Sequence, residues 1–173
     1  MIYINEETLE EKDCEHLIDI FFNLPEVEVE VTGENQFLPK MEDWENKSYK
    51  FWHPFGERVH GVLHKDKISY CYAMVKKHLP KNFSDLNYAE LIYYPEGGFM
   101  EWHKDTTDSN DKGTAMVFLN DNYLGGNLNV SGHRLITKQG TTVAFENSTE
   151  VFHGVEPVYK GERFVFALWF GKA

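Results

Sequence analysis

Hydrophobic and polar residues follow two different patterns in the two halves of the chain. In the first half, apolar residues recur at helical spacing over residues 8–24 and 66–80. Thr8 is a candidate N-cap for the first segment, which stops before Pro25, and Pro80 ends the second. The pattern predicts two amphipathic helices that serve as scaffold rather than as a site.

From about Asn87 the pattern changes to short runs rich in β-branched and aromatic residues, separated by glycine-containing turns. None of these runs has a helical period. The runs span residues 87–94, 99–103, 114–120, 127–130, 134–138, 141–145, 151–158 and 163–170. So many short strands in sequence predict an antiparallel sandwich or barrel such as a jelly roll.

No internal repeat, low-complexity segment or Pro/Gly/Ser-rich linker separates the two halves. We therefore predict one domain over residues 1–173, with a helical supporting half (1–86) packed on a β core (87–170). The fold class is mainly β with flanking helices (α+β), and the helices are expected to pack on one sheet of the jelly roll.

Composition narrows the classes of function. With 173 residues, 42% of them hydrophobic, the chain can fill a substantial core. The formal net charge of −11 disfavours nucleic acid as a partner. Cys14 and Cys71 are too few for a zinc–cysteine site or a disulfide framework. Neither a signal peptide nor a membrane-spanning run is evident, so we expect a soluble cytoplasmic protein without membrane contact.

Three side chains carry candidate metal chemistry. His103 and Asp105 lie two residues apart at the end of a predicted strand, so both would project to the same face. A lone pair of this kind is usually only a hydrogen-bonded pair at a strand end. His153, about fifty residues later on another predicted strand, completes a set of two histidines and one carboxylate. That set is the facial triad that holds non-haem Fe(II) and leaves open positions for substrate and O₂.

Arg163 lies ten residues after His153, on the return strand of a predicted hairpin. A guanidinium directed into an apolar barrel needs an anionic partner, and its planar fork fits a carboxylate. The alternative is an exposed charge on the hairpin surface.

Taken together, HKD at 103–105, HGVEPVYKGER at 153–163, YYPEGG before the first histidine, and Gly125, Gly126 and Leu128 between them resemble the Fe(II)/2-oxoglutarate-dependent dioxygenases. The resemblance runs from about Ala89 to Phe170 and is greatest to the prolyl 4-hydroxylase-like branch. It implies a double-stranded β-helix, a form of jelly roll, with Fe(II), 2-oxoglutarate and O₂ as cofactor and cosubstrates, and ascorbate as a candidate stimulant.

The resemblance also assigns roles to single residues. His103, Asp105 and His153 would bind Fe(II), Arg163 would pair with the distal carboxylate of 2-oxoglutarate, and Tyr94 would hydrogen-bond the cosubstrate or line its pocket. Trp169 would lie near the pocket, although core packing explains it equally well. Phe118 departs from a tyrosine that helps to hold the same carboxylate in some relatives, and it cannot donate that hydrogen bond.

The implied reaction is hydroxylation of an unactivated C–H bond, with decarboxylation of 2-oxoglutarate to succinate. We expect a prolyl residue in a protein or peptide as substrate, with a free amino acid or other small molecule as the alternative. AlkB-type nucleic-acid demethylation is disfavoured because no second arginine follows Arg163 closely. A catalytically silent jelly-roll binding module is the non-enzyme alternative. The aromatic cluster at residues 49–55 is a candidate lid or substrate platform, and the sequence does not indicate an oligomeric state.

Overall fold

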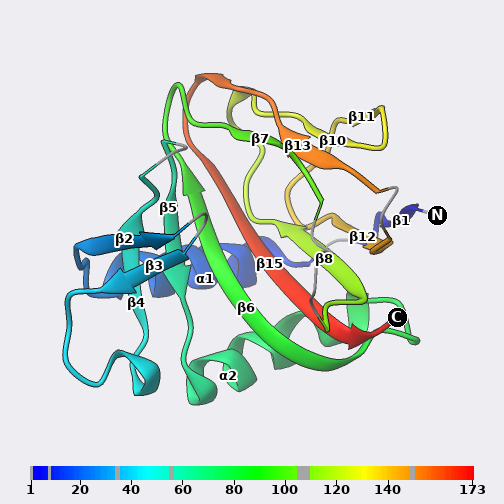
Figure 1. Ribbon diagram of the computed structural model, residues 1–173. Coiled ribbons are helices and arrows are strands. Elements are labelled where there is room, and N and C mark those ends of the chain that lie inside the picture. Colours follow the sequence, from blue (N-terminus) through cyan, green and yellow to red (C-terminus); the bar gives the residue numbers. More distant parts are fainter. Residues whose placement is uncertain (1, 8, 34–35, 55–56, 105–109, 149–150) are drawn as a thin grey trace.

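The computed structural model describes residues 2–7, 9–33, 36–54, 57–104, 110–148 and 151–173 (Figure 1). The described chain is built on a seven-stranded antiparallel sheet that faces a smaller four-stranded sheet. The large sheet has the order β1 (Ile2–Asn5), β12 (Thr142–Glu146), β8 (Gly113–Phe118), β15 (Arg163–Lys172), β6 (Ser84–Tyr94), β5 (Val59–Val62), β4 (Tyr49–Trp52). The small sheet has the order β11 (His133–Leu135), β10 (Leu128–Val130), β13 (His153–Val155), β7 (Met100–His103).

Two further pairs of strands lie outside these sheets. One pair is β9 (Leu124–Gly125) with β14 (Val158–Lys160), and the other is the hairpin of β2 (Val29–Gly33) and β3 (Gln36–Pro39). The antiparallel two-sheet arrangement confirms the predicted jelly-roll fold.

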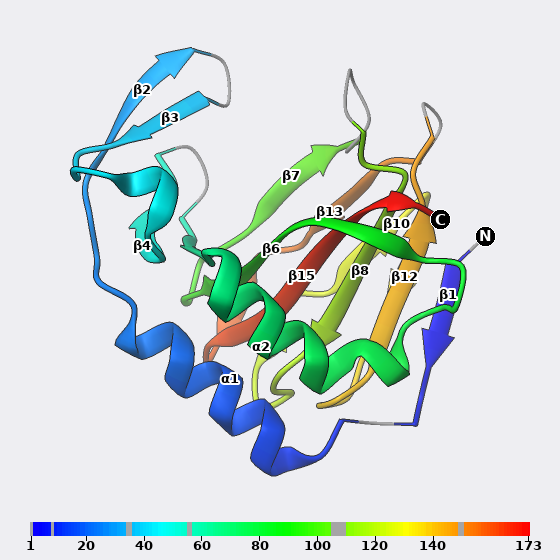
Figure 2. The ribbon, with the colours of Figure 1, turned by 90° about the horizontal axis from the view of Figure 1, so that it is seen from below.

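Both helices pack on the outer face of the large sheet (Figure 2). Helix α1 (Glu11–Asn23) buries Cys14, Leu17 and Phe21, which recur on one side of the helix. Helix α2 (Lys65–Val75) buries Cys71 and Val75 and continues as a 3₁₀ turn, η2 (Lys76–His78); a second 3₁₀ turn, η1 (Trp44–Asn46), precedes β4. The predicted cap Thr8 lies outside the described residues, and the helix begins later than its predicted segment.

The core has two layers. One lies between the helices and the large sheet and includes Leu17, Phe21, Leu91 and Phe166. The other lies between the two sheets and includes Tyr94, Phe118, Leu128, Val155 and Val165. Alternate residues of the same strand supply the two layers because successive side chains point to opposite faces.

The N-terminal half differs from the largely helical support that the sequence predicted. Strands β1, β4 and β5 extend the large sheet at both edges, and β5 pairs directly with β6 across the expected boundary between the halves. The aromatic cluster at residues 49–55 begins with β4, so part of it belongs to the sheet. In the described part of the chain, no helix combines the length and apolar character needed to cross a lipid bilayer.

Candidate active site

His103 and His153 come together across two antiparallel strands of the small sheet. They are directly opposite partners in the pairing of β7 with β13, and their ring centres lie 4.2 Å apart. His153 is 1% exposed, and the Phe145 ring packs against it at 5.0 Å. Strand pairing therefore brings two residues that are distant in sequence into the geometry of neighbouring ligands.

The backbone sets the tautomer of His103. Nδ1 of His103 lies 2.8 Å from the carbonyl oxygen of Glu101, which can only accept a hydrogen bond. Nδ1 therefore carries the proton, and Nε2 has the lone pair that a metal ligand needs. A backbone carbonyl that fixes the orientation of a histidine in this way is a common second partner of metal-binding imidazoles.

The third predicted ligand, Asp105, lies outside the described residues. Among the residues that the structure does describe, no three His, Cys, Asp or Glu side chains gather closely enough to hold a metal ion. Assignment of Asp105 as a ligand thus rests on its position two residues after His103 and stays a prediction.

Arg163 is buried between the two sheets, at the start of β15 and directly opposite Tyr94 of β6. It is 0% exposed, and within the described chain Nε, Nη1 and Nη2 have no hydrogen-bond partner. Its Cζ atom lies 4.7 Å from the Tyr94 ring centre and 5.2 Å from that of Phe118. A buried guanidinium without an anionic partner is costly, so this arrangement favours a site for a carboxylate. The alternative of an exposed charge on the hairpin is wrong.

Gly126 makes room for the stem of Arg163. Its φ angle is +62°, and a Cβ atom there would lie 3.1 Å from Cδ of Arg163 and 3.0 Å from Cγ2 of Val158. The positive φ strains any other residue at this position, and the two short contacts would force the neighbouring side chains to shift, so both favour glycine. This accounts in physical terms for a glycine at position 126, between the strands that carry His103 and His153.

Tyr94 supplies a hydroxyl group next to Arg163. It is 1% exposed, and its hydroxyl donates weakly to Sδ of Met100 at 3.9 Å. Burial raises the pKa of Tyr94, while the positive charges of Arg163 and Arg58 act in the opposite direction. The hydroxyl is thus protonated at neutral pH and is a candidate donor in place of the one that Phe118 lacks.

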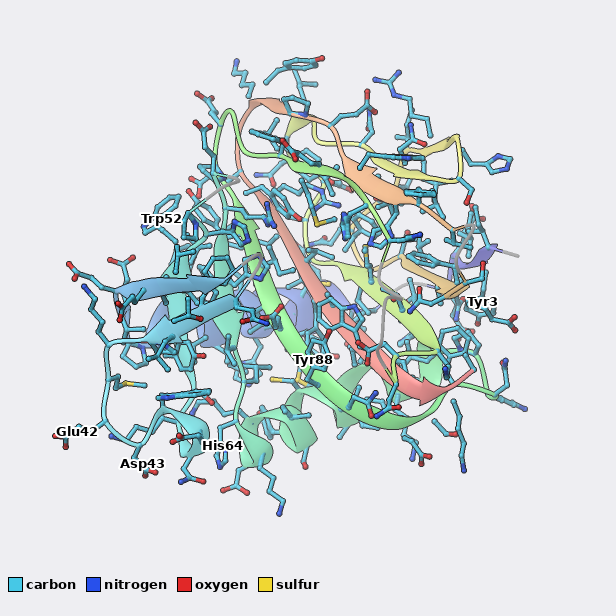
Figure 3. All side chains as sticks on the ribbon, viewed as in Figure 1. Tyr3, Glu42, Asp43, Trp52, His64 and Tyr88 are labelled. Atoms are coloured by element: carbon cyan, nitrogen blue, oxygen red, sulfur yellow. The ribbon has the colours of Figure 1, made fainter. Side chains whose placement is uncertain are left out.

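Trp169 lies six residues beyond Arg163 on β15, which corresponds to roughly 20 Å along a strand. Its ring stacks on Tyr88 at 4.5 Å with an interplanar angle of 14°. Figure 3 shows Tyr88 in front of β6 and β15, on the side of the large sheet that faces the small sheet. Trp169 is therefore connected to the site through Tyr88, and its predicted role at the cosubstrate stays a prediction.

A cleft of about 620 Å³ opens next to His103. Residues from β3 to β7 and the adjoining loops line it: Phe37, Phe51, His53, Arg58, His60, Tyr88, Glu90, Met100, Glu101, Trp102, His103 and Lys104. The polar wall formed by Arg58, His60 and Glu90 was not identified from the sequence. These residues come from separate strands, with Glu90 diagonally opposite His60 in the pairing of β5 with β6, and no sequence spacing announces them.

Comparison with known families identifies the core. A family model described as "2OG-Fe(II) oxygenase superfamily" matches residues 89–171. The matched segment contains both histidines and Arg163, and it supports the resemblance to the 2OG-Fe(II) oxygenases that the sequence predicted. No curated protein matches the sequence.

Solved structures of prolyl hydroxylases share the fold. A Pseudomonas putida prolyl-4-hydroxylase has 17% identity and a TM-score of 0.64, covering 98% of this chain and 91% of its own. A viral collagen prolyl hydroxylase from Paramecium Bursaria Chlorella virus-1, solved with 2OG, has 16% identity and a TM-score of 0.62, with coverages of 97% and 94%. A Trichoplax adhaerens prolyl hydroxylase in complex with a hypoxia-inducible-factor peptide has 14% identity and a TM-score of 0.66, with coverages of 98% and 82%.

Proposed function

We propose that the protein is a 2-oxoglutarate-dependent hydroxylase of an unactivated C–H bond, with a prolyl residue in a protein or peptide as the favoured substrate. The observation that carries this proposal is the buried Arg163 guanidinium, whose three nitrogens have no hydrogen-bond partner in the described chain. It belongs to the same two-sheet core as the paired histidines. A cosubstrate carboxylate would supply the charge that this pocket otherwise lacks.

Fe(II) would be held by His103, Asp105 and His153. The two imidazoles and the carboxylate form the nitrogen and oxygen donor set expected for non-haem iron, and His103 is oriented by the Glu101 carbonyl at 2.8 Å. When bound, the metal supplies the O₂ chemistry that couples decarboxylation of 2-oxoglutarate to hydroxylation. The protein's task is to hold the ligands on one face and leave the other face open.

The distal carboxylate of 2-oxoglutarate would pair with Arg163, with the Tyr94 hydroxyl as an additional donor. A guanidinium fork binds a carboxylate through two parallel hydrogen bonds, which fixes the orientation of the cosubstrate as well as its position. The apolar side chains around it, including Phe118, Val158 and Val165, exclude water and so strengthen this pairing.

The substrate would occupy the cleft beside His103. Its aromatic side chains, among them Phe37, Phe51 and Trp102, suit the flat apolar face of a proline ring. The similarity of the fold to prolyl hydroxylases, one of them solved with a peptide, supports a peptide substrate.

The test is to incubate the purified chain with Fe(II), 2-oxoglutarate, O₂ and a panel of proline-containing peptides. We expect peptide-stimulated formation of succinate and a peptide mass increased by one oxygen atom. If 2-oxoglutarate is consumed but no peptide is modified, the peptides tested are not substrates, and free amino acids and other small molecules are assayed next for a gain of one oxygen atom. If Fe(II) and 2-oxoglutarate do not bind, the proposal is wrong.

A further inference from the structure

The polar wall of the cleft is a series of three hydrogen-bonded side chains, in which each donor and acceptor can be assigned. Nε of Arg58 donates to Nε2 of His60 at 2.9 Å, and Nδ1 of His60 lies 3.1 Å from Oε2 of Glu90. Because Nε2 of His60 accepts a hydrogen bond, the ring proton is on Nδ1 and is donated to the Glu90 carboxylate. The hydrogen-bonded series therefore leads from a guanidinium through a neutral imidazole to a carboxylate.

The two outer members of this series, Arg58 and Glu90, differ in the hydrogen-bonding capacity that they offer a ligand. Arg58 is committed to the protein, since its Nη1 also donates to the carbonyl oxygen of Phe99 at 3.3 Å. Glu90 uses only Oε2, and its other oxygen, Oε1, accepts no hydrogen bond from any described residue. The His60 and Glu90 side chains are only 14% and 16% exposed. Glu90 thus presents unused acceptor capacity to the cleft, where little water screens its charge.

The surroundings of Glu90 suit a cation. The Phe51 ring stacks on His60 at 5.6 Å, and Phe37 of β3 packs against Phe51 at 5.8 Å. Both rings line the same cleft as Glu90, and aromatic faces and a carboxylate in one cleft each attract a positively charged nitrogen. Lys104 also lines the cleft, but its ammonium group lies over the Phe152 ring, with Nζ 5.4 Å from the ring centre. The net charge of −11 adds a long-range attraction for cationic ligands.

We propose that Glu90 determines specificity by binding a positively charged nitrogen of the substrate, close to the residue that is oxidised. The nitrogen belongs to a lysine or arginine side chain or to a terminal ammonium group. The inference rests on the proposed function for the position of the oxidised carbon, but the charge preference is measurable without turnover. Arg58 and His60 are positioning residues, because their hydrogen bonds hold Oε2 of the Glu90 carboxylate, whose side chain lines the cleft.

The test uses proline-containing peptides that are blocked at both ends and differ only in the residue next to proline: lysine, glutamine or glutamate. A fourth peptide carries glutamine and a free amino terminus, which separates a terminal ammonium from a side chain. Binding is measured by calorimetry on protein loaded with Mn(II) and 2-oxoglutarate, and turnover is measured separately with Fe(II). We expect at least one cationic peptide to bind on the order of tenfold tighter than the blocked glutamine peptide, and the glutamate peptide to bind weakest.

Glu90→Gln is the decisive variant, because its amide oxygen still accepts from His60 while the charge is lost. The cationic preference should fall to roughly onefold, whereas Glu90→Asp, which keeps the charge, should retain part of it. Glu146→Gln is the matched control, since Glu146 is exposed on β12 and does not line the cleft. Thermal unfolding with and without 2-oxoglutarate verifies that each variant is folded and binds its cosubstrate.

The outcomes separate this inference from the proposed function. A cationic preference that Glu90→Gln removes supports the inference even if no peptide is oxidised, in which case prolyl hydroxylation alone fails. Peptides that are oxidised without a charge preference overturn the inference and leave the proposed function standing. Absence of binding by every peptide, or a preference that survives in folded Glu90→Gln, also overturns it.

Discussion

Replacing Arg163 with methionine tests whether the buried guanidinium exists to bind an anion. Within the described chain its three nitrogens have no hydrogen-bond partner, and its Cζ atom lies 4.7 Å and 5.2 Å from the ring centres of Tyr94 and Phe118. Such burial costs several kcal/mol, which cation–π contacts of about 1–2 kcal/mol each offset only in part. Without 2-oxoglutarate, Arg163→Met should therefore leave the free energy of unfolding unchanged or raise it by about 1–4 kcal/mol.

In the presence of 2-oxoglutarate, the wild type should become the more stable of the two proteins. Charge-assisted hydrogen bonds contribute about 1.5–3 kcal/mol each, so loss of a bidentate pair should weaken 2-oxoglutarate binding on the order of 10²- to 10⁴-fold. At a ligand concentration about 100 times the Kd, the wild type gains about 2.7 kcal/mol, which raises its Tm by about 5–10 °C. Arg163→Met should show almost no shift at the same concentration.

The assay is thermal unfolding in the presence of Mn(II), with and without 2-oxoglutarate. Arg134→Met is the matched control, because Arg134 is exposed and bonds to Glu156 at 2.8 Å, so the same change should leave the cosubstrate shift intact. The reasoning is refuted if Arg163→Met lowers the Tm of the ligand-free protein by several degrees and keeps the full cosubstrate shift. In that case Arg163 would be a structural cation.

Three further predictions concern the surroundings of the site and the core. Gly126→Ala should lower the free energy of unfolding by about 1–3 kcal/mol and weaken 2-oxoglutarate binding, because alanine is strained at a φ of +62° and its Cβ atom would crowd the Arg163 stem. Both effects are measurable by thermal unfolding. Burial lowers the pKa of His53 from 6.5 to about 3, so the unfolded chain binds more protons between these values. The free energy of unfolding in urea should fall as the pH is lowered through that window, and His53→Gln should flatten the dependence. Burial raises the pKa of Cys14 and of Cys71 to about 11, so neither thiol should react with a disulfide reagent at neutral pH until the protein is unfolded; rapid reaction of the folded protein would contradict this.

The strands of the second half are predictable from the sequence because their signals are local. Strand β8 (Gly113–Phe118) is buried at every position, and an uninterrupted apolar run is the sequence mark of such a strand. Glycines with positive φ, such as Gly132 and Gly161, separate the runs and identify the turns. The same kind of local signal predicts both helices, whose apolar faces carry the buried Cys14 and Cys71.

The edge strands of the first half are not predictable in this way. Strands β4 and β5 are four residues each, and their buried and partly exposed positions alternate over too short a length to be distinguished from a loop. Their place in the sheet depends on pairing of β5 with β6, whose residues are about thirty positions later. Such long-range pairing has no local signal.

The residues of the candidate site also fall into those that the sequence indicates and those that depend on long-range strand pairing. His103, His153 and Arg163 could be proposed as site residues from their types and spacing, and the structure places the two histidines side by side and buries Arg163. The hydrogen-bonded series of Arg58, His60 and Glu90 could not be predicted from the sequence. These three residue types are common, and they come together only through the pairing of β5 with β6. Tyr94 is intermediate, since its position in the sequence suggested a role and its burial beside Arg163 shows what it contacts.

The most direct test of the central claim is anaerobic titration of the apo-protein with Fe(II) and 2-oxoglutarate. The titration is monitored by the visible charge-transfer band of the chelated complex. Asp105→Ala and His153→Ala are titrated in parallel, after their folding has been verified. We predict a band in the wild type that is absent from both variants, with loss of 2-oxoglutarate turnover. A folded wild type without the band, or an Asp105→Ala variant that keeps full turnover, would contradict the account.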